Sequence, residues 1–255
     1  MEKIISVRDA ALTYQAEDGE VQALKRVSFS VDPGEFISIV GSSGCGKSTL
    51  LGAIAGLEQL SAGEITVCGE KVTAPHHHMG LMPQRDQLFE WWDIWHNVTL
   101  GLLVRGMDDE PHRQRVKQLL QRYGLEEFRD KKPSQLSGGM RQRCALIRTL
   151  ATDPQILLLD EPFSALDYQT RLQVSCDIFG IIRAEGKTAL LVTHDIAEAI
   201  SLSDRIVVLS RRPAEVKTVV DVGPLRKLAP MQRRDSPAFS GLFDTIWKEL
   251  DIHDR

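Results

Sequence analysis

The sequence has no closely spaced cysteines, no long apolar run and no excess of positive charge. The four cysteines, Cys45, Cys68, Cys144 and Cys176, are scattered, so they form neither a disulfide framework nor a zinc pattern, as in a reducing cytosol. No stretch reaches the ~18 consecutive apolar residues of a membrane span, so any membrane crossing falls to another subunit. The net charge of −4 argues against a nucleic-acid binder that uses a broad basic surface.

What is present is enough apolar sequence for a real core. The 255 residues, 42% of them apolar, suit one large domain or two small ones. The first part alternates as strands do. The expected short strands are 4–7, 27–31 and 36–40, with a turn at Asp18-Gly19 and a hairpin over 64–72 that turns at Gly69.

The rest of the chain predicts helices first and buried strands afterwards. Residues 88–153 are rich in Leu, Arg and Gln at helical spacing, notably over 113–123 and 139–151. Continuous apolar runs then indicate parallel strands that are covered on both faces. These strands are 156–160 and 188–193, separated by a helix over 170–184 as in a βαβ unit, followed by a strand over 205–210 and an amphipathic helix over 239–250.

One segment predicts a phosphate site. It runs Gly41-Ser42-Ser43-Gly44-Cys45-Gly46-Lys47-Ser48-Thr49, which fits G-x-x-x-x-G-K-[ST] between an expected strand and an expected helix. The glycines let several backbone N–H groups point at one anion, and the helix adds its positive dipole end. Lys47 would neutralise the β- and γ-phosphates, and Ser48 would offer a hydroxyl to Mg²⁺. A simple glycine-rich turn is the alternative, but a chance match in such a chain is on the order of one in a hundred.

Two acids end the buried strand over 156–160. Asp160 is well placed to hold Mg²⁺ through its waters, which leaves Glu161 to polarise the attacking water as a general base. Solvated acids at a strand end would be the better interpretation in isolation. A phosphate loop earlier in the chain favours the catalytic one.

A second anion site is predicted at Leu136-Ser137-Gly138-Gly139-Met140-Arg141-Gln142-Arg143. Ser137 can cap a helix there, and the two glycines expose backbone N–H groups. The first loop already binds the phosphates, so this site makes sense if it completes the nucleotide site of a second copy. A plain helix cap is the alternative.

With these motifs in this order, the chain resembles the ATP-binding cassette (ABC) ATPases over nearly all of residues 1–210. The resemblance implies an α/β fold, a P-loop NTPase cassette with a mixed or parallel core sheet and an N-terminal antiparallel β subdomain. It also implies an ATPase domain over 1–210 with a helical subdomain inserted at about 88–155, and a short C-terminal extension over 211–255.

The resemblance also implies roles for individual residues. Tyr14 falls where the family stacks an aromatic ring on adenine, although a surface or edge-strand tyrosine is the alternative. Gln84 matches the glutamine that touches Mg²⁺ and water and senses the membrane partner. His194 matches the histidine at the γ-phosphate, and Asp167 belongs to the loop that communicates across the dimer. The implied ATP site is Tyr14, Gly41, Ser42, Ser43, Gly44, Cys45, Gly46, Lys47, Ser48, Thr49, Ser137, Gly138, Gly139 and Asp167, with Ser48, Gln84 and Asp160 at Mg²⁺ and Glu161, His194 and Gln84 in catalysis.

The expected function is that of the ATPase subunit of a bacterial importer. The segment over 161–167 looks like importer cassettes, and the tail with Arg211-Arg212-Pro213 resembles the nitrate/sulfonate/taurine group, which also serves thiamine-precursor importers. The implied partners are an identical second cassette, a membrane permease and, indirectly, an extracytoplasmic solute-binding protein, with no nucleic acid. The chain would then lie peripherally on the cytoplasmic face of the inner membrane. The alternatives are an exporter or lipid-releasing ATPase and a soluble cassette ATPase without a transporter.

Two unusual clusters stay open. Trp91, Trp92 and Trp95 lie where the family forms the groove for a permease helix, but each could equally pack the core of the helical subdomain. The run His76-His77-His78 could bind a metal. With no fourth ligand or acidic partner close in sequence, an ordinary exposed loop is the favoured interpretation.

Overall fold

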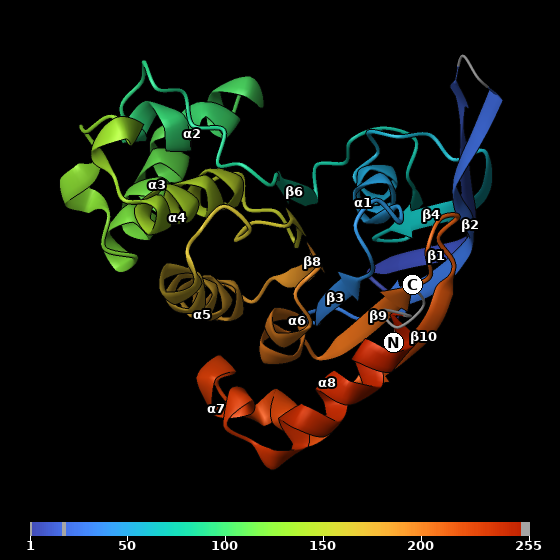
Figure 1. Ribbon diagram of the computed structural model, residues 1–255. Helices are drawn as coiled ribbons and strands as arrows, with labels where there is room; N and C mark the ends of the chain where they lie inside the picture. Colours follow the sequence, from blue (N-terminus) through green and yellow to red (C-terminus); the bar gives the residue numbers. More distant parts are fainter. Residues whose placement is uncertain (1, 17–18, 251–255) are drawn as a thin grey trace.

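The computed structural model describes residues 2–16 and 19–250, which form two β-sheets with helices packed around them (Figure 1). The first sheet is antiparallel, in the order β2-β1-β4-β5. Its strands are β1 (Ile5–Ala16), β2 (Gly19–Val31), β4 (Ala62–Val67) and β5 (Glu70–Lys71). This is the expected N-terminal antiparallel β subdomain, and the hairpin predicted over 64–72 is confirmed.

The second sheet is the mixed core sheet. Its order is β10-β9-β3-β8-β7-β6, in which β9, β3, β8, β7 and β6 are parallel and β10 is antiparallel to β9. The strands are β3 (Phe36–Val40), β6 (Met79–Met82), β7 (Ile156–Asp160), β8 (Thr188–Thr193), β9 (Arg205–Leu209) and β10 (Val216–Asp221). The carboxyl ends of the parallel strands share one edge, where ligands bind in such folds.

The inner strands are buried on both faces, as their continuous apolar sequences predict. On β7, Leu157 and Leu159 pack toward the helical subdomain, whereas Ile156 and Leu158 pack toward the first sheet. On the latter side the sheet is covered by α1 (Lys47–Ile54). The other face is covered by α5 (Tyr168–Ala184) and α6 (Ile196–Leu202).

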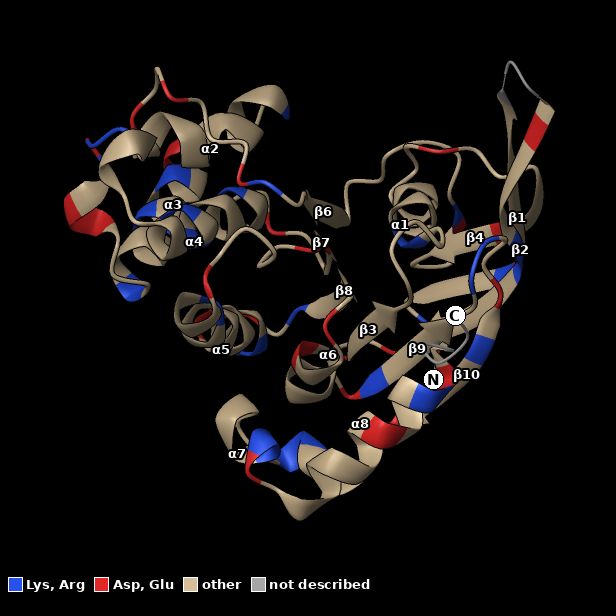
Figure 2. Cartoon of the chain, in the orientation of Figure 1, with Lys and Arg blue, Asp and Glu red and all other residues tan. Residues whose placement is uncertain are grey.

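The helical subdomain lies between β6 and β7 in the chain and forms a separate lobe in Figure 1. It contains α2 (Ile94–Val104), α3 (Glu110–Arg122) and α4 (Gly138–Leu150), with 3₁₀ turns over Glu126–Phe128 and Pro133–Gln135. Asp93, Asp109 and Ser137 cap the three helices by accepting backbone N–H groups. Figure 2 shows acidic and basic segments interspersed over this lobe and the C-terminal helices, in agreement with the low net charge.

The segment after β9 packs closely on the core sheet. It adds β10, a 3₁₀ turn over Gly223–Lys227, α7 (Pro230–Arg234) and α8 (Pro237–Glu249), and α7 and α8 both contact α6. Arg233 is fully buried and donates to the carbonyl oxygens of Ile200 and Ser203. The amphipathic helix predicted over 239–250 is confirmed as α8. In the described part of the chain, no helix is long and apolar enough to cross a membrane.

Strands β1 and β2 of the first sheet are much longer than the short ones predicted. Asp9 and Arg26 both adopt a φ of 46°, and the pairing of β1 with β2 shifts register between Val7 and Ala10. Such bulges interrupt the apolar–polar alternation on which the prediction relied. Of the predicted turn at Asp18-Gly19, Asp18 lies outside the described residues.

Candidate functional site

The phosphate loop joins the end of β3 to the start of α1. Gly46 adopts a φ of 123°, and a Cβ there would lie 3.0 Å from the Ala23 carbonyl oxygen, so a larger residue would be strained. Lys47 is buried, and its Nζ donates to the carbonyl oxygens of Gly41 and Ser42 at 3.0 Å each. The ammonium group is thus held inside the loop, where anionic phosphate oxygens are better partners than neutral carbonyls.

Ser48 and Asp160 meet at the mouth of this loop although 112 positions separate them in sequence. The Ser48 hydroxyl donates to Asp160 Oδ1 at 3.0 Å. Burial raises the pKa of Asp160, and the neighbouring charge of Glu161 adds to the increase. A hydroxyl and a half-buried carboxylate suit a hard cation such as Mg²⁺, whose charge would favour the ionised form of Asp160.

Glu161 and His194 form the second predicted pair. They follow the adjacent strands β7 and β8, and His194 Nδ1 lies 3.0 Å from Glu161 Oε2. Glu161 adopts a φ of 44°, a conformation rare for residues other than glycine, and its N–H donates to the Val192 carbonyl at 2.9 Å. Its carboxylate is therefore held by its backbone conformation beside both the loop and the histidine.

Gln84, which follows β6, completes this side of the site. Its Nε2 donates to the Ser164 hydroxyl at 3.2 Å, and that hydroxyl donates to the Glu161 carbonyl at 3.0 Å. These groups surround a cavity of about 290 Å³ at the carboxyl edge of the sheet. The cavity is lined by Ser43, Gly44, Gly46, Lys47, Ser48, Thr49, Gln84, Asp160, Glu161 and Arg212.

Arg212 is a cavity residue that the sequence analysis missed. Ala214, two positions later, exchanges backbone hydrogen bonds with β2 through Ala23 and Lys25, both at 2.9 Å. Ala214 also lies against the phosphate loop, because a Cβ on Gly46 would be 3.4 Å from the Ala214 Cβ. This anchor places Arg212 at the cavity. The Arg-Arg-Pro sequence after β9 was visible, but no sequence pattern connects it with the phosphate loop.

The segment Ser137-Gly138-Gly139 does not join this cavity within one chain. This segment begins α4. The Ser137 hydroxyl accepts a hydrogen bond from the Met140 N–H at 3.3 Å, so Ser137 caps the helix as predicted. A Cβ on Gly139 would lie 2.7 Å from Val174 Cγ2, so close packing of α4 on α5 requires this glycine. Ser137 and Gly139 line a separate cavity of about 360 Å³, which shares none of its described lining residues with the first.

Three other predicted residues are not among those that line the phosphate cavity. Cys45 is buried, and burial raises the pKa of its thiol above the ordinary value. Tyr14 lies on β1 opposite Val21 and is 37% exposed, away from the residues that line the phosphate cavity. Asp167 caps α5 by accepting the Thr170 N–H at 3.1 Å.

A polar link between the Gln84 segment and α4 was also missed. Arg141 donates to both carboxylate oxygens of Asp86 at 2.9 and 3.0 Å, and Arg148 donates to the Asp86 and Gln87 carbonyls at 2.6 and 2.7 Å. A bidentate arginine–carboxylate pair fixes orientation as well as distance. The helix that begins at Ser137 and the loop that follows Gln84 are therefore joined. Pairing over 55 positions in sequence leaves no local signal.

Comparison with known proteins agrees with this geometry. The family model described as "ABC transporter" matches residues 24–164, from β2 through the phosphate loop and α4 to Ser164. The chain belongs to the ABC transporter family. It is an ABC ATPase that binds ATP, and the predicted cassette fold is confirmed.

The relatives of this ABC ATPase extend over nearly its whole length. It is 44% identical to the "Uncharacterized ABC transporter ATP-binding protein YtlC" of Bacillus subtilis (strain 168), over 94% of this chain and 92% of that protein. It is 38% identical to the "Aliphatic sulfonates import ATP-binding protein SsuB" of Bacillus thuringiensis subsp. konkukian (strain 97-27), over 97% of this chain and 96% of that protein.

A solved structure of the same family provides a comparison for the nucleotide site. The dimeric post-hydrolysis state of the ATP-binding cassette MJ0796, bound to ADP and Pi, is 32% identical and matches with a TM-score of 0.72. The match covers 86% of this ABC ATPase and 98% of that chain.

Proposed function

We propose that this ABC ATPase drives the uptake of a small solute, of the sulfonate, nitrate or taurine type or a thiamine precursor, through a separate membrane permease. The observation that carries the proposal is the 38% identity to a sulfonate import subunit over 97% of the chain. So little of the chain is left unmatched that the similarity must reach into the segment after residue 210, which carries Arg212 into the phosphate cavity.

The working unit is a head-to-tail dimer of two identical chains. The cavity at the phosphate loop lacks the second anion site, and the cavity at Ser137 and Gly139 lacks the phosphate loop. Two copies facing each other would bring each half-site onto the same ATP, with Asp167 near the boundary and Tyr14 on the adenine. ATP then favours the closed pair because it contacts both chains only in that state.

The acids at the strand ends carry out hydrolysis. Glu161 accepts a proton from water as the water oxygen attacks the γ-phosphorus, and ADP leaves with the electrons of the broken P–O bond. His194, 3.0 Å from the Glu161 carboxylate, orients it and faces the γ-phosphate. Ser48, Gln84 and Asp160 would hold Mg²⁺, which neutralises charge on the β- and γ-phosphates when bound. Loss of the γ-phosphate removes the contacts that closed the dimer.

The permease docks on the helical subdomain near the aromatic segment. Trp91 is 68% exposed and its ring centroid lies 4.9 Å from that of Phe89, so it offers an apolar anchor to a partner helix. Trp95 instead packs against the core of the subdomain, with Arg129 over its ring. The two alternatives for the tryptophans thus apply to different residues. Movement at the docking site reaches the nucleotide through Asp86 and Gln84. The subunit itself is peripheral, on the cytoplasmic face of the membrane.

Co-purification tests the partner and the chemistry together. A tagged Glu161→Gln variant, isolated from native membranes with ATP present, should retain ATP and form a stable dimer. It should also bring down a multi-span permease whose gene lies beside the gene for an extracytoplasmic binding protein. The control is Lys47→Ala, which should lose ATP binding and dimer trapping. Rapid ATP turnover by Glu161→Gln would remove Glu161 from the role of general base.

A second measurement tests direction and cargo. Deletion of the gene should abolish uptake of one labelled solute among an aliphatic sulfonate, nitrate, taurine and a thiamine precursor, and the wild-type gene but not Glu161→Gln should restore it. Recovery of only soluble partners in the co-purification, or faster loss of a preloaded solute from wild-type cells, would contradict import.

A further inference from the structure

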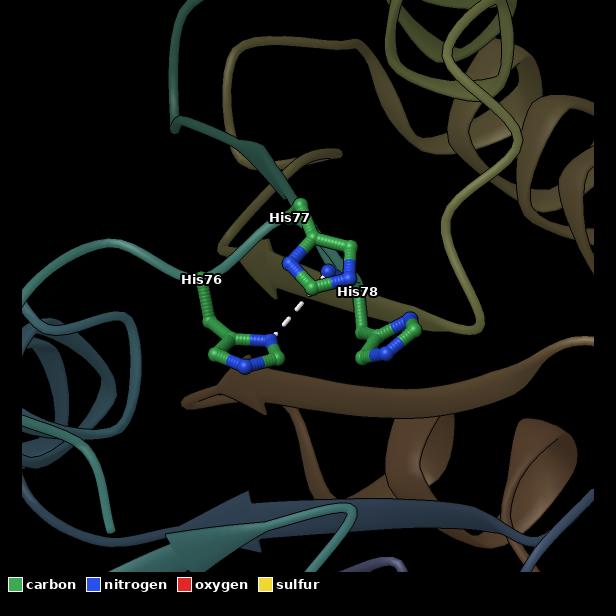
Figure 3. A group of neighbouring side chains, drawn as sticks. All are labelled: His76, His77 and His78. Atoms are coloured by element: carbon green, nitrogen blue, oxygen red, sulfur yellow. Dashed lines mark hydrogen bonds between the residues drawn. The ribbon is translucent and has the colours of Figure 1, made fainter. Parts of the chain in front are cut away.

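The run His76-His77-His78 forms a compact cluster in the loop between β5 and β6 (Figure 3). One ring nitrogen from each histidine lies within 4.8 Å of one from each of the others. The ring centroids are 3.9 Å apart for His77 and His78 and 4.5 Å apart for His76 and His77. Three neutral imidazoles so close together offer three ligand atoms to one ion.

An acidic partner, which the sequence seemed to lack, comes from the preceding hairpin. Glu70 Oε2 lies 2.8 Å from His76 Nε2, and His76 Nδ1 accepts a weaker bond from the His78 N–H at 3.3 Å. A carboxylate on one ring nitrogen sets the tautomer, and a metal at the other nitrogen, Nδ1, would replace the weak bond from the His78 N–H.

The loop is held in place by the helical subdomain. Arg105, which ends α2, donates to the His77 carbonyl at 2.9 Å and to the Met79 carbonyl at 3.4 Å. The cluster lines a cavity of about 850 Å³, which the side chains of Arg105, Asp153 and Lys187 also reach. This cavity lies at the amino ends of β6, β7 and β8, whereas Gln84, Asp160 and His194 follow their carboxyl ends. It is therefore separate from the nucleotide site.

We propose that His76, His77 and His78 bind one transition-metal ion that prefers imidazole, with Zn²⁺ as the reference case and Glu70 as the residue that orients His76. Zinc bound at ~2.0–2.1 Å in tetrahedral geometry separates its ligand nitrogens by about 3.4 Å. The ring nitrogens of the three histidines must therefore approach one another by only about 1–2 Å, the difference between this separation and their present spacing. Side-chain rotations can achieve this, because His77 is exposed. Because all three histidines line the cavity, water within it could supply a fourth ligand. A hard cation such as Mg²⁺, which prefers oxygen, is not the expected occupant.

Zinc titration of the full chain tests the site. The protein is purified without a polyhistidine tag and titrated with ZnCl₂ by calorimetry, in the absence of nucleotide. We expect the wild type to bind one equivalent of zinc per chain. The control variant His96→Asn, on α2 outside the cluster, should bind the same amount. The binding should be lost when His76, His77 and His78 are all changed to Asn. Glu70→Gln should weaken zinc binding by about 10- to 100-fold, the usual effect of losing such an orienting carboxylate.

Two further readouts separate this site from other binding. Added CoCl₂ should give the intense visible absorption of four-coordinate cobalt in the wild type but not in the triple variant. Lys47→Ala should keep its full zinc stoichiometry, because the phosphate loop lies at the other edge of the sheet. Equal zinc affinity in the wild type and a triple variant with unchanged circular dichroism would overturn the proposal, as would an octahedral cobalt spectrum.

Discussion

A buried carboxyl group that follows His194 in the chain gives the most quantitative prediction. Glu198 lies in the first turn of α6, is only 5% exposed, and has a pKa raised from 4.5 to about 7. Burial is the main cause, and the charge of Asp195 adds to it, whereas the Thr193 hydroxyl, Arg171 and Arg234 act in the opposite direction. The shift corresponds to about 3 kcal/mol of differential stability between the two protonation states.

The sign follows from proton binding. Between pH 4.5 and 7 the folded chain holds the Glu198 proton more tightly than the unfolded chain, so the free energy of unfolding must fall as pH rises through this window. Glu198→Gln has no proton to lose. From pH 5 to 8.5 the wild type should therefore lose about 2–3 kcal/mol relative to Glu198→Gln, with little further change at higher pH.

Urea unfolding of both proteins across this pH range measures the difference directly. Glu127→Gln, a change of an exposed carboxylate in the helical subdomain, is the matched control and should run parallel to the wild type. Parallel curves for the wild type and Glu198→Gln would refute the reasoning, because Glu198 would then titrate alike in the folded and unfolded chains. If the wild type instead lost stability relative to Glu198→Gln as pH falls, the predicted sign would be refuted.

The remaining predictions concern the two half-sites. Arg212→Ala should weaken binding of a fluorescent ATP analogue by roughly 10- to 100-fold, because it removes a charged hydrogen-bond donor from the phosphate cavity. The control is Lys227→Ala, which removes an exposed cation of the same C-terminal segment and should change the affinity little. Equal losses of affinity in the two variants would contradict a specific contact of Arg212 with ATP. Gly139→Ala should lower the free energy of unfolding by about 1–3 kcal/mol, since its Cβ would meet Val174, whereas Gly180→Ala, with open space in the helix α5, should raise it by up to about 1 kcal/mol. Denaturant unfolding measures both, and equal effects would refute the packing argument.

The parts of the fold that the sequence predicts well are those in which one local rule dominates. β7 and β8 carry unbroken apolar runs because both of their faces are covered, and that pattern survives without knowledge of the partners. The phosphate loop is likewise local, since its glycines, Lys47 and Ser48 act within one turn. β1 and β2 were underestimated because bulges at Asp9 and Arg26 reset the alternation, and nothing in the local sequence marks where a bulge occurs.

The same distinction applies to the site. Asp160, Glu161 and His194 were predictable because parallel strands deliver their carboxyl-end residues to one edge, so proximity follows from fold class alone. Arg212 and Glu70 were not predictable, because each reaches its site through contacts of a loop or hairpin whose path depends on tertiary packing.

The polar links explain how the incomplete half-sites could act together. Gln84 contacts Ser164, whose hydroxyl donates to the carbonyl of Glu161, the proposed general base. Asp86, two residues later, is held by Arg141 on α4, the helix that opens with the proposed second anion site. Burial of the Asp86 carboxyl opposes its ionisation, but the two Arg141 hydrogen bonds and the Leu88 N–H hold its pKa below the usual value, so the pair stays ionised and intact. A shift of the Gln84 loop on loss of the γ-phosphate would therefore be carried to α4. In the proposed dimer, α4 of each chain presents its anion site to the ATP that is bound at the phosphate loop of the other chain. Hydrolysis at the phosphate loop of one chain would therefore weaken the contact between α4 of that same chain and the ATP on the other chain.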